Sequence, residues 1–427
     1  MSSTDASGAS TPRLSRRSLK ALFAASGGGG ILSGFVSPTD GNHFFEEQSE
    51  TSRRKIEVYG KYLKPLSYKI LSRYKRLWIV DAYAGAGAYD PDAEGNRAAG
   101  SPLIAANFAR QHNVNSAKAG KEIRLINVEA HPERFARLEE TLMGFRPDVT
   151  NLRGRFQDHL DDILQTIGSD PVLFFIDPFG MEGADIRIIE RMLERRSRTV
   201  TELLINFSDR GFLRMAGNLD AKAKRPQDLA AAQTKVKTLD AILGTSFWQG
   251  AWRNPDLSTE EKLEQVAALY ADQLRACGID FVNGVQMRDA WDGPTAYRLV
   301  FATRSAHGVY LMSDIVARYE RELFDTRFEG SFDLVWAAEK QAEEKVALRT
   351  EIHEFGLARG DATPLQVFLH FGPICFGKWT QTDYMACLRE LVALGGIERA
   401  NAVGIKQREQ LRFIPLAQVD LFSGTGT

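Results

Sequence analysis

Residues 77–87 read Leu-Trp-Ile-Val-Asp-Ala-Tyr-Ala-Gly-Ala-Gly, and this stretch decides the predicted fold. A short apolar run that ends in an acid and then in small residues is typical of a buried strand followed by a tight turn. The two glycines let the backbone approach a ligand closely, with amide groups exposed. Ala88-Tyr89-Asp90 follows, so the stretch lacks the third glycine that a dinucleotide site would need.

Strands and helices alternate along the chain beyond this stretch. Short apolar runs predict strands, which are expected at 123–128, 149–153, 172–176 and 202–206. Helical spacing predicts the intervening helices at 101–110, 132–143, 160–167 and 186–193. Such alternation produces right-handed crossovers and a parallel sheet buried on both faces. Two later runs, 282–287 and 297–303, flank turn residues and predict an antiparallel pair. The predicted fold class is a Rossmann-like, doubly wound α/β sheet with an antiparallel last strand.

The chain has 427 residues, of which 44% are hydrophobic, so it is long enough for two or three globular domains. A helix with apolar residues in register is expected over 50–74, interrupted by Pro65. Three helices and two short strands predict a winged helix-turn-helix near the end of the chain, with the helices at 344–357, 364–371 and 382–394 and the strands at 397–399 and 411–414. The expected domains are a disordered leader at 1–40, the α/β domain at 41–340 with a mainly helical insertion at 210–275, the winged helix at 341–418 and a tail at 419–427.

The charge and the cysteine content limit the kinds of function that the chain can have. The formal net charge is −1, so the whole-chain balance favours neither a nucleic-acid binder nor an acidic-surface binder. Three scattered cysteines are too few for a disulfide framework and have no zinc-ligand spacing, so no metal site is expected. No apolar run reaches the roughly 18–20 residues that span a bilayer. Arg16-Arg17 precedes only a five-residue apolar run, too short for an export signal. A cytoplasmic location is therefore expected.

Polar residues end four of the predicted strands: Asp81, Glu129, Asp177 and Asn206. In open parallel sheets, ligands bind beyond the carboxyl ends of the strands. We therefore expect a site where these four residues meet.

The first candidate group would hold a cofactor. Asp81 before the glycines suits a ligand with a nearby cation, such as the ammonium and sulfonium of S-adenosylmethionine, and Glu129 is placed to accept hydrogen bonds from a ribose diol. Asp158 could take an adenine amine. Each has a structural alternative: a plain strand-to-helix turn at Asp81, a solvated strand-end acid at Glu129 and the N-cap of a helix over 159–167 at Asp158.

The second candidate group would act on a substrate. Asp177-Pro178-Phe179-Gly180 ends the most apolar strand. A carboxylate there can orient a nucleophilic amine, and the Phe179 ring can stack on a base. Asn206 is a second candidate for the same site. The alternative is an ordinary strand-end turn.

Together these residues resemble a class I S-adenosylmethionine-dependent methyltransferase. Residues 81–87, with Tyr83, Gly85 and Gly87, are similar to the cofactor loop D-x-F-[AC]-G-x-G of its nucleic-acid branch. Asp177-Pro178-Phe179 is similar to the catalytic loop D-P-P-[YFW] of amino-methylating enzymes, with Phe179 in place of the second proline.

The closer resemblance, over about residues 43–415, is to the three-Cys-motif partner (TcmP) family. The matching segments are His43-Phe44-Phe45 before a helix with Lys55, Val80 to Gly87, Gly100-Ser101-Pro102-Leu103, 175–180 and Leu204-Ile205-Asn206-Phe207. The resemblance implies a methyltransferase-like fold, a winged-helix tail and a separate partner protein that bears a three-cysteine motif. It implies neither the reaction nor the substrate.

The sequence thus predicts an enzyme, an S-adenosylmethionine-dependent methyltransferase that acts on DNA or RNA. The alternative is a non-catalytic scaffold of the same fold that binds nucleic acid or its partner protein. The expected loop of about thirteen residues after Gly87, and Phe179 in the catalytic loop, are compatible with either. A nicotinamide dehydrogenase is disfavoured because no catalytic His or Tyr-Lys arrangement follows a strand end.

Overall fold

The structure is a computed structural model, and it describes residues 50–91, 97–146, 148–181, 183, 185–195, 199–220, 225–288, 293, 295–328, 333–399 and 404–416. All of them belong to one unit, Glu46–Thr427. The leader predicted at 1–40, the motif His43-Phe44-Phe45 and the tail predicted at 419–427 lie outside the described residues.

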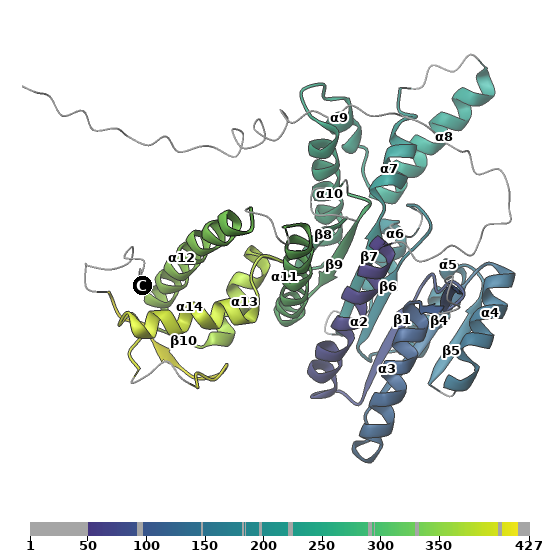
Figure 1. Cartoon of the computed structure of the whole chain (residues 1–427). Helices are drawn as coiled ribbons and strands as arrows, with labels where there is room; N and C mark the ends of the chain where they lie inside the picture. Colours follow the sequence, from purple (N-terminus) through teal and green to yellow (C-terminus); the bar gives the residue numbers. More distant parts are fainter. Residues whose placement is uncertain are drawn as a thin grey trace, which may run out of the picture. The chain divides into compact units, whose positions relative to one another are not determined.

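A seven-stranded sheet forms the centre of the α/β part (Figure 1). Its strands are β1 (Arg76–Asp81), β4 (Glu122–Glu129), β5 (Val149–Arg153), β6 (Val172–Ile176), β7 (Thr201–Phe207), β8 (Phe281–Met287) and β9 (Tyr297–Thr303). Their spatial order is β5-β4-β1-β6-β7-β9-β8. The first five strands of that order pair in parallel, and β9 is antiparallel to both of its neighbours. The predicted doubly wound, mostly parallel sheet with an antiparallel last strand is confirmed.

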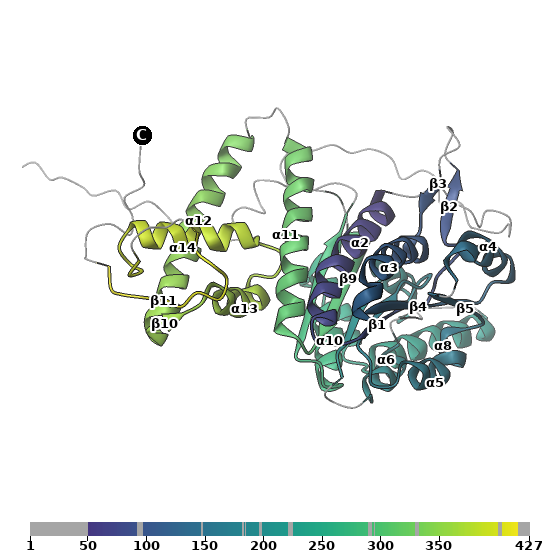
Figure 2. The ribbon, with the colours of Figure 1, turned by 90° about the horizontal axis from the view of Figure 1, so that it is seen from below.

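Helices cover both faces of this sheet (Figure 2). The side chains of β1 alternate between the faces: Leu77 and Ile79 join the core under α2 (Glu50–Leu71), α3 (Ser101–Ser116) and α11 (Ala306–Phe328), whereas Val80 joins the opposite core. That second core lies against α5 (Phe156–Ile167) and α6 (Ile186–Leu193). Because both faces are buried, the strands read as continuous apolar runs.

Helix α2 runs through Pro65, so the predicted interruption there is wrong. Proline removes one backbone hydrogen bond inside a helix. The helix is retained because its apolar stripe is almost fully buried, with Tyr59, Tyr62, Leu63 and Leu66 each at most 3% exposed.

The long loop predicted after Gly87 is also wrong in part. The described residues there form two short antiparallel strands, β2 (Ala88–Pro91) and β3 (Arg97–Ala99). Asp92 and Glu94 lie outside the described residues. The pair returns the chain to Gly87, whose carbonyl accepts a hydrogen bond from Gly100 N at 2.9 Å. The glycine loop is therefore closed before α3 begins.

The stretch predicted as a helical insertion, 210–275, is mainly helical among its described residues. It contains α7 (Asp209–Ala216), α8 (Pro226–Leu243), α9 (Trp248–Arg253) and α10 (Thr259–Ala276). The buried rings of Phe212 and Trp248 pack edge to face, with their centres 5.5 Å apart, and join α7 to α9.

Helix α4 (Pro132–Leu142) lies outside this stretch and connects β4 to β5.

The C-terminal part has three helices: α12 (Asp333–Arg359), α13 (Pro364–Ile374) and α14 (Gln381–Ala393). Strand β11 (Leu411–Arg412) pairs with β10 (Asp361–Ala362), and this pairing was not expected. The hairpin predicted between 397–399 and 411–414 is reduced to a bridge between Ile397 and Phe413 with two flanking backbone hydrogen bonds. Helix α12 runs across residue 341, so the boundary between the two domains stays a prediction.

Candidate active site

Four strand-end residues predicted from the sequence meet at one edge of the sheet. Asp81, Glu129, Asp177 and Asn206 lie at or directly beside the carboxyl ends of β1, β4, β6 and β7, which are neighbours in the order β4-β1-β6-β7. This geometry confirms that the residues converge; their chemical roles remain predictions.

Asp81 lies at the centre of this edge and is 2% exposed. Its Oδ2 accepts a hydrogen bond from Ser101 Oγ at 2.6 Å, and its Oδ1 accepts one from Tyr83 N at 3.2 Å. The pKa of Asp81 is raised to about 7, mainly by burial and in smaller part by the nearby Asp177 carboxylate, while the two hydrogen bonds and the Lys55 ammonium oppose the rise. A cation placed beside Asp81 would therefore be stabilised strongly by the ionised carboxylate.

Gly85 and Gly87 shape the loop that follows Asp81. Both adopt positive φ, at 62° and 81°, where a side chain would be strained. Gly100 packs so closely on this loop that a Cβ there would lie 2.9 Å from the carbonyl oxygen of Gly87. The backbone therefore requires glycine at these positions, whereas their predicted role in ligand binding stays a prediction.

Glu129 closes over the same loop and is 5% exposed. Its Oε2 accepts a hydrogen bond from Gly85 N at 2.9 Å, and its Oε1 accepts one from His131 N at 2.6 Å. Arg134 forms an ion pair with Oε1 at 3.2 Å. Glu129 is therefore not a solvated strand-end acid, and its carboxylate is held in a fixed orientation.

Asp177 is held by two groups of its own chain. The Lys55 ammonium donates to Oδ2, and Asn206 Nδ2 donates to Oδ1 at 2.6 Å. The Lys55 side chain is 6% exposed and lies 5.1 Å from the centre of the Tyr297 ring. Asn206 Oδ1 is buried and has no hydrogen-bond partner among the described residues. A buried acceptor of this kind points to a donor that arrives from outside the described protein groups.

The residues after Asp177 divide between the core and the surface. Pro178 is buried against Gly183, where a Cβ would lie 2.5 Å from the proline ring. Phe179 is 84% exposed, and the Arg134 guanidinium lies 4.9 Å from the centre of its ring. An exposed ring at a strand end, backed by a cation, is free to stack on a planar substrate.

Asp158 and Tyr83 complete the predicted residues. Asp158 is exposed in the first turn of α5, which begins at Phe156 with Arg155 as its N-cap. The alternative of Asp158 as the N-cap is therefore wrong, because the helix starts three residues earlier than predicted. The Tyr83 ring lies 6.4 Å from that of Phe156, so the loop after β1 and the start of α5 are neighbours.

Sequence reasoning did not place Lys55 in the site. The sequence pattern could nevertheless have indicated its burial. Lys55 falls on the apolar stripe of α2, in helical register with Tyr59, Tyr62 and Leu66. A lysine on a buried helix face requires a partner. Ser101, expected only as a helix start, donates to Asp81.

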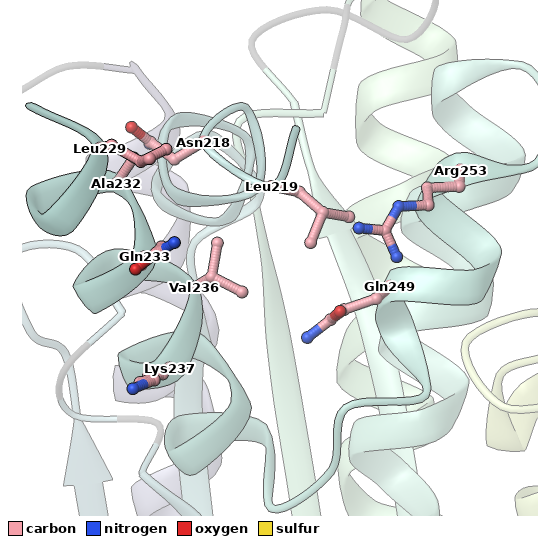
Figure 3. Close-up of a pocket in the computed structure, with 9 residues that line it drawn as sticks. All are labelled: Asn218, Leu219, Leu229, Ala232, Gln233, Val236, Lys237, Gln249 and Arg253. Atoms are coloured by element: carbon pink, nitrogen blue, oxygen red, sulfur yellow. The ribbon is translucent and has the colours of Figure 1, made fainter. Parts of the chain in front are cut away.

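A hollow of about 260 Å³ lies elsewhere, among α7, α8 and α9 (Figure 3). It is lined by insertion residues that include Leu219, Val236 and Gln249, and it contains none of the strand-end residues. Within the described residues, no group of three or more His, Cys, Asp or Glu side chains is arranged to hold a metal ion. No helix in the described part is long and apolar enough to cross a membrane.

No protein-family model matches the chain, and no curated protein matches its sequence. A search of solved structures finds remote matches to the backbone fold. One is a Legionella pneumophila protein of the family DUF519, with 13% identity and a TM-score of 0.36; the match covers 61% of this chain and 86% of that one. The DszA carbon methyltransferase has 12% identity, a TM-score of 0.34 and coverage of 60% and 55%. The precorrin-6y C5,15-methyltransferase of Geobacter metallireducens has 14% identity, a TM-score of 0.27 and coverage of 57% and 88%. At these scores the likeness is remote, and it adds no argument about function.

Proposed function

We propose that this protein is an S-adenosylmethionine-dependent methyltransferase that acts on nucleic acid. The observation that carries the proposal is the buried Asp81 at the central strand end, next to the positive-φ glycine loop and the fixed Glu129 carboxylate. A dinucleotide pyrophosphate would be repelled by these two acids, whereas a cationic ligand with a ribose is attracted by them.

The residues present fit this cofactor. A carboxyl group whose pKa is about 7 is costly to ionise in its buried site, and a ligand cation would offset that cost. Glu129 keeps lone pairs for a ribose diol beside its contacts with Gly85 and His131. Asp158 is exposed near Tyr83 and Phe156, where an adenine amine would find an acceptor. When bound, the cofactor supplies an electrophilic methyl group on a sulfonium.

Asp177, Asn206 and Lys55 would position the nucleophile. The unpartnered Oδ1 of Asn206 can accept a hydrogen bond from a substrate amine or hydroxyl, while Lys55 holds the Asp177 carboxylate in place. Phe179 would stack on the substrate base. Positioning of this kind is the main contribution that a protein can make to a direct displacement.

Calorimetry with S-adenosylmethionine tests the cofactor half of the proposal. We expect the wild type to bind it and Asp81→Asn to bind it at least about tenfold more weakly, because the loss of a charge-assisted contact costs about 1.5–3 kcal/mol. Glu202→Gln is the matched control, since Glu202 is also buried, with a pKa raised to about 7, but lies at the start of β7. Equal effects of the two substitutions, or no binding by folded wild type, would contradict the proposal.

The second candidate function is a non-catalytic scaffold that binds nucleic acid or a protein partner. One observation favours it: both oxygens of Asp177 already accept from groups of this chain, so a substrate amine would have to share an Asp177 oxygen with Lys55 or Asn206. Transfer of a labelled methyl group onto host DNA, RNA and protein separates the two functions. Transfer that Asp177→Ala abolishes supports the enzyme; cofactor-independent nucleic-acid binding that survives Asp177→Ala, without any transfer, supports the scaffold.

The tail and the partner belong to the same proposal. Three helices and a short antiparallel pair, with β10 between α12 and α13 and β11 after α14, are compatible with the winged helix that the sequence predicts. Two basic residues of this part form ion pairs, since Arg399 pairs with Glu409 and Arg412 with Glu398. We also propose, from the resemblance alone, a three-Cys-motif protein as partner. From the cysteine content and the short apolar run after Arg16-Arg17, we propose a cytoplasmic location. Co-purification of the full chain with that protein from the host tests the partnership.

A further inference from the structure

A group of basic side chains gathers at the edge of the sheet where the strands begin. Lys69 lies in the last turn of α2, Arg73 lies two residues beyond the end of that helix, and Arg408 comes from the segment before β11. His307, in the first turn of α11, lies among them. These residues are brought together from three regions of the chain.

Contacts between the elements bring these three regions together. Gly308, beside His307, packs against Glu202, which accepts a hydrogen bond from Tyr62 on α2. Tyr310 of α11 stacks on Phe368 of α13 at 5.1 Å, one turn from Leu365, whose N donates to Gln407 O.

The pKa shifts of two of the basic groups agree with this arrangement. The pKa of Lys69 is lowered by burial and then by the positive charges of Arg73 and Arg408. The pKa of His307 is lowered by burial and then by Lys69, Arg73 and Arg408. The charged groups that lower these two pKa values are all cations, which agrees with a locally positive surface on a chain whose net charge is −1.

In the part of the chain that the structure describes, no carboxylate lies within ion-pair distance of Lys69, Arg73 or Arg408. This contrasts with Arg399 and Arg412 of the same C-terminal part, which have Glu409 and Glu398 as partners. The segment that carries Arg408 is anchored, because Leu365 N donates to Gln407 O at 2.9 Å and Glu409 N donates to Lys406 O at 3.0 Å. An anchored cation without an acid partner is available to an external anion.

Two exposed aromatic residues are sequence neighbours of these cations. The Tyr68 side chain is 68% exposed beside Lys69, and Tyr74 is 36% exposed beside Arg73. Interleaved cations and exposed rings are typical of surfaces that follow a nucleic-acid backbone. An acidic protein segment would explain the cations but would leave the two exposed tyrosines without a function.

The surface is separate from the candidate active site. Lys69 and Arg73 precede β1, whereas Asp81 ends it, so about 20 Å of strand lies between them. We propose that the basic surface of Lys69, Arg73 and Arg408 binds the phosphodiester backbone of a nucleic acid and anchors it apart from the reacting group. This inference rests on the nucleic-acid half of the proposed function and is independent of methyl transfer.

Fluorescence anisotropy with a labelled DNA duplex, and with an RNA duplex of the same sequence, tests the inference on the full chain. The variant carries Lys69→Gln, Arg73→Gln and Arg408→Gln. Because each phosphate contact on DNA contributes about 0.9 to the slope of log affinity against log salt, we expect the slope to fall by about 2–3 and the affinity by at least about thirtyfold at roughly 0.1 M salt.

The matched control is Arg191→Gln, Arg225→Gln and Arg253→Gln, which removes the same charge from exposed arginines that already pair with Asp161, Asp228 and Asp220. We expect a change of less than about threefold for this control. Equal losses in both variants would show a net-charge effect, and an unchanged slope in the first would show no contact; either overturns the inference. The inference would also be overturned if the triple substitution of Lys69, Arg73 and Arg408 weakened the binding of polyglutamate more than the binding of DNA and RNA.

S-adenosylmethionine binding by the same variants keeps the two proposals distinguishable. Because the basic surface lies at the opposite edge, both triple variants should bind the cofactor as the wild type does. A protein that binds nucleic acid through Lys69, Arg73 and Arg408 but never binds the cofactor would refute the methyltransferase and leave the anchoring surface supported. Melting curves show that each variant is folded.

Discussion

The Lys55 ammonium on α2 donates to the Asp177 carboxylate after β6, a contact that joins residues 122 positions apart. The exposed fractions are 6% for the Lys55 side chain and 21% for that of Asp177. The pair fastens the first described helix to the strand end that carries the candidate catalytic loop. Its position couples the stability of the fold to the geometry of the site.

Replacement of Lys55 by Met should therefore destabilise the protein. The substitution leaves a largely buried carboxylate without its counter-charge, and we expect a loss of about 3 kcal/mol in the free energy of unfolding, measured in urea. Lys61→Met is the matched control on the same helix, because Lys61 is 40% exposed and pairs with Glu57 and Glu322. It should cost less than about 1 kcal/mol. Similar losses in the two variants would contradict a buried ion pair.

The pH dependence of stability should reflect Asp81. Its pKa in the folded protein is about 7, above the unfolded value of about 3.9, so protonation favours the folded state. Its contribution is complete below about pH 4 and is lost as the pH rises to about 7. Between about pH 4 and pH 7, the free energy of unfolding of the wild type should fall by about 4 kcal/mol more than that of Asp81→Asn. Denaturant titration at each pH measures this difference. Parallel curves for the two proteins would refute the assignment.

Cofactor binding should have the opposite pH dependence if the proposed function is right. A ligand cation prefers the ionised form of Asp81, so binding releases a proton where the free carboxyl is protonated. The affinity for S-adenosylmethionine should rise by about tenfold from pH 6 to pH 8 and then level off. Calorimetry in buffers of different ionisation enthalpy measures the proton release. Asp81→Asn should bind weakly with no such rise; a rise that persists in this variant would assign it to another group.

Much of the sheet was predictable because parallel strands buried on both faces read as continuous apolar runs. The bounds of β5 and β6 agree with the prediction, and β1, β4 and β7 extend by one or two residues. The two-residue strands β10 and β11 are too short to show any alternation, so their pairing could not be read from the sequence.

The candidate site was predictable in part for a topological reason. A strand-end residue is placed by its strand, so Asp81 and Asp177 could be assigned to one edge from the order of the elements. Lys55 could not be assigned in this way, because its contact depends on how α2 packs across the sheet. The reading of Asp158 as an N-cap was wrong because α5 begins earlier, at the apolar Phe156, and has no capping side chain that the sequence could reveal.

The close approach of Gly100 to the glycine loop gives a further prediction. A Cβ at residue 100 would lie 2.9 Å from Gly87 O, which is backbone and cannot swing aside. We expect Gly100→Ala to displace the loop, to cost about 1–3 kcal/mol of stability and to weaken cofactor binding by at least about tenfold. Gly85→Ala separates strain from displacement, because nothing lies within 4 Å of its Cβ and only its φ of 62° is unfavourable. It should cost about 1–2 kcal/mol, and binding weakened equally in both variants would contradict the role of close packing.

At the opposite edge, Tyr62→Phe should make stability more sensitive to pH. Burial raises the pKa of Glu202 to about 7, and the Tyr62 hydroxyl, which donates to Glu202 Oε2 at 2.6 Å, opposes this by favouring the charged form. Without the hydroxyl the folded-state pKa of Glu202 rises further, so more stability is lost as the pH rises through 7. We expect a deficit of about 2 kcal/mol at pH 8 and a smaller one at pH 5, measured by urea unfolding. A deficit that is larger at pH 5 would show that Tyr62 stabilises the protonated carboxyl instead.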